Sequence, residues 1–217
     1  MTYSFPCTDL SIAGQGLARK DGLKKGSATR SGLLWEVERL LNELGTELPQ
    51  ILLMENVPQV ATTEGFADWC NFLKSKGYIN HWQILNAKNY GVAQNRERCF
   101  MISILSPDYV DFTFPSPVKL EKTVRDYLEP TVDEKYYINT EKAQKLLFEL
   151  SDTIIAEQNR TEQNRLFQCG IDLSTNSSGL KDIANCITVR YDAGICKHKD
   201  ERTGVIEINS CKAEQTI

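Results

Sequence analysis

The sequence predicts an α/β fold, because segments with strand character alternate with segments of helical periodicity over its first half. Residues 51–54 are continuously apolar, as is typical of a parallel strand that is buried on both faces. Two amphipathic segments, at about residues 31–45 and 62–77, flank this run and carry large apolar residues at helical spacing. A layered fold with a largely parallel sheet is therefore expected.

The N-terminal part is expected to supply the end of a strand at residues 3–6 and then a long loop at residues 7–30. This loop is rich in glycine and poor in large apolar residues, and long loops inside compact domains usually carry function. A helix should follow, capped by Ser31 and ended by Gly45. Its apolar side is expected to comprise Leu33, Val37, Leu40, Leu41 and Leu44.

The second helix is expected to be capped by Thr62 or Thr63 and to end at Gly77. Residues 78–85 and 99–105 predict two further strands. The apolar face of the helix should consist of Phe66, Trp69, Cys70 and Leu73.

A domain boundary is predicted where the proline-rich segment at residues 114–117 interrupts the alternation. We expect residues 1–106 to form one partial domain and residues 107–217 to form a second, partial region, with a helix at about residues 140–165. The apolar side of that helix should comprise Leu146, Leu147, Leu150, Ile154 and Ile155.

Composition limits the classes of function. The sequence holds no apolar stretch long enough to span a membrane and no signal peptide at its N-terminus, so a cytoplasmic protein without a membrane partner is expected. The seven cysteines are odd in number and irregularly spaced, which favours free thiols over a disulfide framework. No metal site is expected, because Cys186, Cys196, His198 and Cys211 lack zinc-ligand spacing.

The net charge of −4 is unfavourable for binding nucleic acid, but the basic residues of the first half cluster in one loop. Only Asp21 opposes them, so the cluster is suited to contact phosphates. A solvated surface loop is the alternative interpretation. The cluster consists of Arg19, Lys20, Lys24, Lys25 and Arg30.

Cys7 is the candidate nucleophile. It follows Pro6 at the end of a predicted strand, and ligands of open α/β sheets bind beyond the carboxyl ends of strands. A thiolate is intrinsically very nucleophilic. A buried cysteine that merely fills space is the alternative.

Two further sites carry candidate catalytic residues. Glu55 should point into the same crevice as Cys7, and a dry pocket would favour its neutral, hydrogen-bond-donating form. Arg96 and Arg98 should share one face of an extended strand, where each remains charged and presents a planar fork of donors. The alternatives are an ordinary strand-end carboxylate and a basic surface strand.

Three motifs, at residues 5–14 (FPCTDLSIAG), 54–58 (MENVP) and 94–98 (QNRER), together resemble those of the C5-cytosine DNA methyltransferase family. The resemblance covers about residues 3–130. It implies a partial Rossmann-like methyltransferase sheet followed by a smaller, mixed target-recognition region. It also implies methyl transfer from S-adenosylmethionine to C5 of a cytosine flipped out of double-stranded DNA, within a bacterial or phage restriction-modification system.

The resemblance implies a role for each motif residue. Cys7 would form a covalent adduct at C6 of cytosine, and Glu55 would contact N3 and the amino group. Arg96 would help to order the site, and Arg98 would reach the base and a nearby phosphate. The implied cofactor contacts are Pro6 and Leu33, and the implied DNA contacts are Ser11, Gly14, Arg19, Lys20, Gln94 and Arg98.

The family's glycine-rich cofactor loop and its closing Gly-Asn segment have no match in the sequence. We therefore expect a catalytic fragment, or one subunit of a split enzyme whose second polypeptide supplies the cofactor-binding half. The strand at residues 3–6 should then be an exposed sheet edge, and the isolated chain marginally stable.

Two other interpretations stay open at this point. One is an inactive remnant that binds DNA weakly and transfers nothing. The other is an unrelated thiol hydrolase, although neither His81 nor His198 lies in a motif that would pair it with Cys7.

Overall fold

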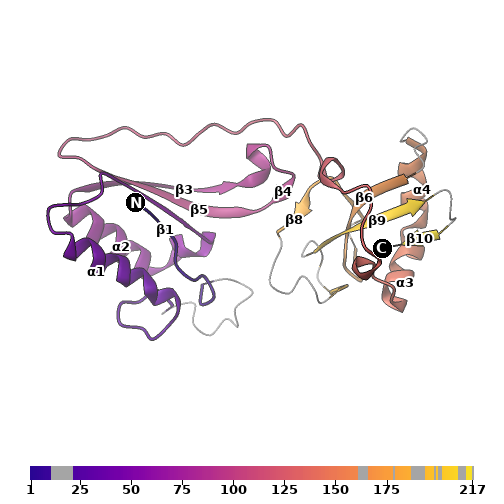
Figure 1. Ribbon diagram of the computed structural model, residues 1–217, viewed down its shortest axis with the longest axis horizontal. Coiled ribbons are helices and arrows are strands. Elements are labelled where there is room, and N and C mark those ends of the chain that lie inside the picture. Colours follow the sequence, from indigo (N-terminus) through magenta and orange to yellow (C-terminus); the bar gives the residue numbers. More distant parts are fainter. Residues whose placement is uncertain are drawn as a thin grey trace. The chain divides into compact units, whose positions relative to one another are not determined.

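A computed structural model describes most of the chain, which divides into two compact units (Figure 1). Unit 1 comprises Met1–Asn86 and Glu97–Ser116, and unit 2 comprises Ala87–Arg96 and Pro117–Ile217. The predicted roles of a catalytic domain and a target-recognition region stay predictions. The described residues are 1–10, 22–160, 166–177, 179–186, 194–197, 199, 202–209 and 214–216.

Unit 1 is built on a four-stranded mixed sheet of order β1-β2-β5-β3. The edge strand β1 (Thr2–Tyr3) runs parallel to β2 (Ile51–Asn56), whereas β5 (Glu97–Leu105) runs antiparallel to both β2 and β3 (Tyr78–Asn86). The expectation of a largely parallel sheet is therefore wrong. The reason is the short connection Ala87–Arg96 between β3 and β5, which holds no crossover helix and so suits antiparallel neighbours.

Two α-helices, α1 (Leu34–Glu43) and α2 (Glu64–Ser75), lie on one side of this sheet (Figure 1). Each follows a 3₁₀ turn, at Ser31–Leu33 and Pro58–Thr62 respectively. The predicted cap of α2 is confirmed at Thr63, whose hydroxyl accepts a hydrogen bond of 3.2 Å from the backbone N–H of Phe66. The glycines predicted to end the helices have positive φ, 57° at Gly45 and 90° at Gly77.

The core of unit 1 lies between these helices and the sheet, and Trp69 of α2 is at its centre. The indole is fully buried, stacks on Phe72 with ring centroids 5.4 Å apart, and meets Trp35 edge-on at 6.2 Å. Its Nε1–H donates a hydrogen bond of 2.8 Å to the hydroxyl of Tyr3. This bond ties the edge strand β1 to the helix layer.

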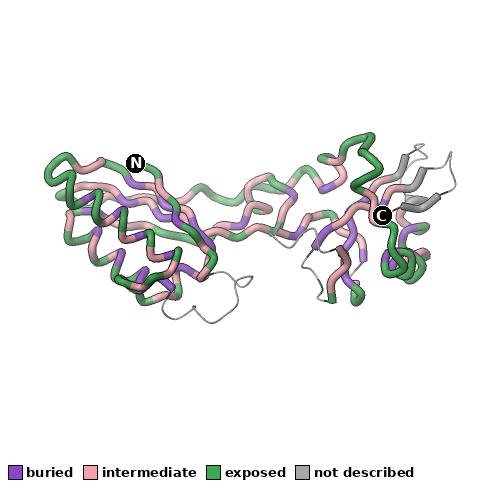
Figure 2. Tube along the Cα trace, turned by 60° about the horizontal axis from the view of Figure 1, so that its bottom comes forward, coloured by how far each residue is buried: buried purple, intermediate pink, exposed green. Residues whose placement is uncertain are grey.

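Only one face of the unit 1 sheet packs against these helices. Along β2, Leu52, Met54 and Asn56 are buried, while the alternate residues Ile51 and Leu53 are not, and Ile51 is 52% exposed. Buried and less buried positions alternate along the tube of unit 1 (Figure 2). The expected burial of this strand on both faces is therefore wrong. Both α-helices in the described part of unit 1 share one core with the buried set, so the opposite face keeps contact with solvent.

The buried side of α1 also differs from the prediction. Leu34, Val37 and Leu41 face the core, whereas three leucines assigned to the apolar side are exposed. The regular helix begins at Leu34 rather than at Ser31, which turns a different set of positions toward the sheet. The exposed residues are Leu33, Leu40 and Leu44.

Unit 2 combines a helix pair with an antiparallel sheet of order β10-β9-β6-β7. The single helix expected at residues 140–165 is broken at Leu150 into α3 (Glu141–Glu149) and α4 (Ser151–Arg160). The sequence did not predict the strands of this sheet. These are β6 (Leu166–Asp172), β7 (Leu180–Lys181), β9 (Thr203–Asn209) and β10 (Glu214–Thr216).

Unit 2 also holds a small two-stranded parallel sheet, formed by β4 (Gln94–Asn95) and β8 (Ala184–Asn185). Short 3₁₀ segments complete its described structure, at Ala87–Tyr90, Val124–Tyr127 and Glu134–Tyr136. Across the residues that the structure describes, every helix is too short or too polar to cross a membrane.

The Tyr3–Trp69 bond predicts a stability effect. Tyr3→Phe leaves the buried indole N–H without its acceptor, so we expect the free energy of unfolding of unit 1 to fall by about 1–3 kcal/mol. All three tryptophans, Trp35, Trp69 and Trp82, lie in unit 1, so tryptophan fluorescence in a urea titration reports this unit. Tyr109→Phe, at an exposed position, is the matched control, and equal midpoints for both variants would contradict the assignment.

Candidate active site

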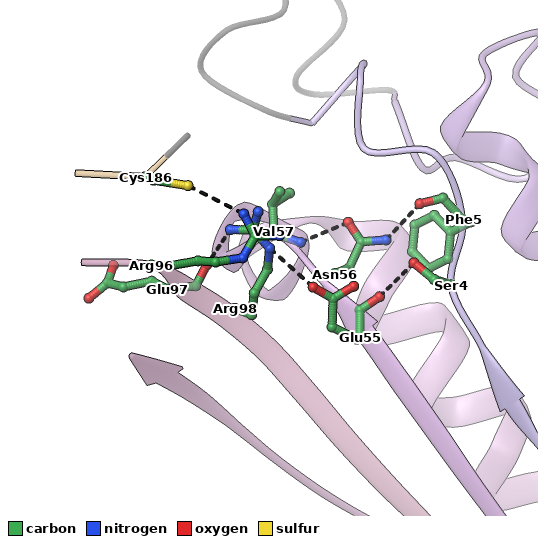
Figure 3. Close-up of polar contacts among 9 residues, drawn as sticks. All are labelled: Ser4, Phe5, Glu55, Asn56, Val57, Arg96, Glu97, Arg98 and Cys186. Atoms are coloured by element: carbon green, nitrogen blue, oxygen red, sulfur yellow. Dashed lines mark hydrogen bonds and ion pairs between the residues drawn. The ribbon is translucent and has the colours of Figure 1, made fainter. Parts of the chain in front are cut away.

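The buried amide of Asn56 joins the Pro-Cys segment to the end of β2 (Figure 3). Its Nδ2 donates to the carbonyl of Phe5 at 3.0 Å, and its Oδ1 accepts from the N–H of Val57 at 2.9 Å. Beside it, the hydroxyl of Ser4 donates to the carbonyl of Glu55 at 2.9 Å. These bonds bring two motifs that lie some fifty positions apart in the sequence to the same end of the sheet.

Glu55 and Arg98 form an ion pair on the face of the sheet that the helices leave open. The Arg98 Nε and the Glu55 Oε1 are 3.1 Å apart, and Arg98 also donates from Nη1 to the carbonyl of Glu97 at 2.6 Å (Figure 3). Glu55 lies inside β2 rather than after it, directly opposite Phe100 of β5. The expected dry pocket is not observed, because the Glu55 side chain is 39% exposed and paired with a cation.

Cys7 lies two residues after the Phe5 carbonyl that Asn56 holds. It is half-buried, packs against the core of unit 1, and its carbonyl accepts a hydrogen bond of 3.0 Å from the N–H of Leu10. Three thiols elsewhere in the chain are held in the protonated form at neutral pH, because burial raises the pKa values of Cys70, Cys99 and Cys169 to about 11 each.

The ends of the loop that follows Cys7 are joined by Ser31. Its hydroxyl donates to the carbonyl of Pro6 at 2.7 Å, and its N–H donates to Oδ2 of Asp9 at 2.9 Å. Ser31 is completely buried and does not cap α1 as predicted, because its hydroxyl is engaged with the Pro-Cys segment. The motif residue Asp9 takes over the capping role from a distance of 22 positions.

All predicted DNA contacts of this loop lie outside the described residues. They are Ser11, Gly14, Arg19 and Lys20. Of the described loop cations, Lys25 is already engaged. Its Nζ lies 2.6 Å from a carboxylate oxygen of Glu38 and 5.5 Å from the ring centroid of Trp35. Lys25 is therefore a less suitable phosphate ligand than the sequence predicts.

Arg96 has a different environment from Arg98. It lies between β4 and β5 and belongs to neither strand, so the predicted alternation along one extended strand is interrupted there. Its Nη1 donates to the Sγ of Cys186 at 3.4 Å, and its carbonyl accepts from the N–H of Ala87 at 2.9 Å. Gln94 lies in β4 and pairs with β8 just before Cys186. No motif in the sequence pointed to Cys186.

The predicted cofactor contacts Pro6 and Leu33 are both exposed. The hydrogen bond from Ser31 to the Pro6 carbonyl places their backbone segments together, so they offer an apolar surface for a ligand. No group of three or more potential metal ligands occurs among the residues with described positions, and His198 is outside them.

Comparison with known proteins finds methyltransferases. The family model for C-5 cytosine-specific DNA methylase matches residues 1–210. The chain is 44% identical over 140 residues to the type II methyltransferase M2.ScrFI of Lactococcus lactis subsp. cremoris, covering 63% of this chain and 37% of that protein. It is 43% identical over 143 residues to the orphan methyltransferase M.SssI of Spiroplasma monobiae, covering 64% and 35%. The chain thus spans little more than a third of these relatives.

Solved structures support the fold. The Entamoeba histolytica methyltransferase EhMeth superposes with a TM-score of 0.57 at 16% identity, covering 89% of this chain and 51% of that chain. The Schizosaccharomyces pombe Dnmt2 methyltransferase gives 0.51 at 22% identity, covering 70% and 46%. With the family model matching nearly its whole length, the chain belongs to the C-5 cytosine-specific DNA methylase family.

Proposed function

We propose that this chain is the catalytic part of a DNA (cytosine-5-)-methyltransferase of a restriction-modification system, acting on double-stranded DNA. The observation that carries the proposal is the convergence, in unit 1, of the first two motifs with Arg98 of the third. Asn56 holds the Pro-Cys segment at the end of β2, and Arg98 of the third motif pairs with Glu55. Family membership and the type II relatives give the reaction class.

In the proposed reaction, the thiolate of Cys7 adds to C6 of a cytosine that has left the DNA stack. The new C–S bond shifts an electron pair toward C5, which then becomes a carbon nucleophile. The C5 electron pair would form a bond to the methyl carbon, and the donor sulfur would leave as a neutral thioether. A base such as water would then take the C5 proton, and the freed electron pair would restore the C5–C6 double bond as the C6–S bond breaks and returns the thiolate. Cys7 is half-buried, in contrast to the fully buried Cys99, and we propose that its sulfur is the one that reaches the base.

Glu55 is proposed to contact N3 and the amino group of the cytosine, which draws electron density from the ring as Cys7 attacks. Arg98 orients this carboxylate through its Nε and has further donors for the base and a phosphate. Arg96 is proposed to order the segment around the site, and Gln94 to contact DNA together with the loop residues Ser11, Gly14, Arg19 and Lys20.

S-adenosylmethionine, when bound, supplies the methyl group. Pro6 and Leu33 are proposed to provide the part of its site that this chain contains, because their exposed apolar surfaces adjoin the Cys7 segment. We propose that a second polypeptide supplies the remainder of the cofactor site.

The first test is transfer of radiolabelled methyl from S-adenosylmethionine to DNA, with the chain alone and with the part of M2.ScrFI that lies outside the matched 140 residues. Transfer should be lost in Cys7→Ser, because a neutral hydroxyl is a far weaker nucleophile than a thiolate. Cys70→Ser, at a thiol away from the site, should retain it. Absence of transfer by the wild-type chain under both conditions would favour an inactive remnant that binds DNA weakly.

Glu55→Gln should lower kcat by about 10²–10⁴-fold with KM for DNA changed only a few-fold, since the proposed role is exerted on the reacting ring. Glu47→Gln, at an exposed carboxylate outside the site, is the matched control. A variant with unchanged kcat and raised KM would assign Glu55 to DNA binding instead.

Alkylation should distinguish the thiols by pH. With pKa values of about 11, only roughly one in a thousand molecules of Cys70, Cys99 and Cys169 is a thiolate at pH 8, and this fraction rises as the pH approaches 11. Iodoacetamide at pH 8 should therefore modify Cys7 well before these three, as followed by peptide mass spectrometry. Equal rates at pH 8 would contradict an accessible Cys7.

A further inference from the structure

Unit 2 contains a cavity that the proposed reaction does not use. Its volume is about 320 Å³, at the lower end of the range for small-molecule sites, and residues 128–138 contribute to its wall. The paired residues Cys169 of β6 and Ile206 of β9 pack into the core shared with α3 and α4. The next pair along these strands, Gln168 and Glu207, lines the cavity, so the cavity lies on the face of the sheet away from the helices.

The carboxylate of Glu207 is oriented in this cavity by two neutral donors. The hydroxyl of Tyr137 donates to its Oε1 at 3.0 Å, and the side-chain amide of Gln168 donates to its Oε2 at 3.1 Å. Gln168 is fixed in turn, because its Nε2 also donates to the backbone carbonyl of Glu129 at 2.9 Å. A carboxylate offers about four acceptor sites, so each oxygen of Glu207 retains capacity for a further donor.

The negative charge of the cavity has no cation beside it. Glu129 and Glu207 are the charged side chains of its described lining, and Glu207 belongs to none of the ion pairs found among the described residues. The nearby Lys135 is engaged elsewhere, with its Nζ 2.9 Å from Oδ2 of Asp133 and 5.0 Å from the ring centroid of Tyr136. A phosphate would be repelled by this cavity, whereas a cation would gain charge-assisted hydrogen bonds.

The rest of the lining favours an organic cation over an inorganic one. No group of three potential metal ligands occurs in the part of the chain that the structure describes, whereas hard metal ions need several oxygen ligands. An organic cation would instead remove its hydrocarbon part from water against apolar side chains, and a tyrosine ring attracts a cation placed over its face. The apolar and aromatic side chains include Leu128, Val132, Tyr136, Ile138 and Val205.

We propose that this cavity binds a planar organic cation, an amidinium or guanidinium group on an apolar body. Two parallel N–H groups of such a fork bind both oxygens of Glu207, on the acceptor sites that Tyr137 and Gln168 leave open. The apolar body lies against Val132 and Val205. The site is independent of methyl transfer, because Cys7 belongs to unit 1 and every lining residue belongs to unit 2.

The test is an NMR titration of the full 217-residue chain, labelled with ¹⁵N, with benzamidine as the cation. Benzamide, which has nearly the same shape but is neutral, is the matched control. We expect benzamidine to bind with a Kd of about 1 mM or lower and to shift the amides of residues 128–138 and 203–207. Benzamide should bind about tenfold more weakly or worse, because only the cation forms charge-assisted bonds with Glu207.

The same cationic group occurs on free small molecules and on arginine side chains. A second titration therefore uses N-acetylarginine methylamide, which presents a guanidinium on an arginine stem. Tighter binding of this compound than of benzamidine would identify the ligand as an arginine side chain. Weaker binding would identify it as a free small molecule with a compact apolar body.

Two substitutions test the assigned contacts. Glu207→Gln keeps the shape of the side chain but removes its charge, so it should weaken benzamidine binding by about tenfold or more. Glu149→Gln, at an exposed carboxylate on α3, is the matched control and should bind normally. Val132→Phe fills the cavity from a position that is 39% exposed and should weaken binding of both benzamidine and benzamide, whereas Val118→Phe, outside the lining and 56% exposed, should not.

The inference would be overturned if neither cation bound the wild-type chain at about 10 mM, or if benzamide bound as tightly as benzamidine. Equal binding by Glu207→Gln and Glu149→Gln, or by Val132→Phe and Val118→Phe, would also overturn it. Circular dichroism melts check that each variant is folded, because the tryptophans lie in unit 1 and do not report on unit 2. If Glu207→Gln does not fold, the comparison of benzamidine with benzamide on the wild-type chain still decides.

Discussion

The candidate site depends on one buried amide. Asn56 lies at the end of the inner strand β2, and both of its polar groups are used, one by Phe5 and one by Val57. A buried amide with either bond missing would cost about 1–3 kcal/mol, so the Pro-Cys segment and β2 are fixed relative to each other. Glu55 directly precedes Asn56, and Cys7 lies two residues after Phe5, the partner of Asn56. The contact between Asn56 and Phe5 therefore sets the distance between Glu55 and Cys7.

A second constraint acts on the loop after Cys7. Asp9 and Pro6 both accept hydrogen bonds from Ser31, so Ser31 is held beside the Pro-Cys segment. The Pro6 carbonyl, directly before Cys7, accepts a hydrogen bond from the hydroxyl of Ser31, which is fully buried. This bond holds the backbone that leads into Cys7. Asp9 and Ser31 thus have a structural role that is separate from catalysis.

Sequence periodicity predicted the helices and strands of unit 1 because each has one strongly apolar side, and Thr63 and Gly77 mark the limits of α2 as expected. It did not predict strand order, because the insertion of β5 between β2 and β3 depends on pairing between distant segments. For the same reason Cys186, ninety positions from Arg96, could not be associated with it. In unit 2, β7 and β10 have only two and three residues, too few to show an alternation, and the seven-residue strands β6 and β9 were missed as well.

The α-helices of unit 1 cover only one face of its sheet, and Glu55 lies on the other face. Glu55 and Leu53 are two residues apart on the same face of β2, so a polypeptide that covers Leu53 also removes water from around Glu55. Loss of water strengthens the interaction of this carboxylate with Arg98 and with any base placed beside it, because charges interact more strongly at low dielectric constant. Because its side chain is 39% exposed, Glu55 keeps water beside it, and its attraction to Arg98 is weaker than the same pair would have in a dry site.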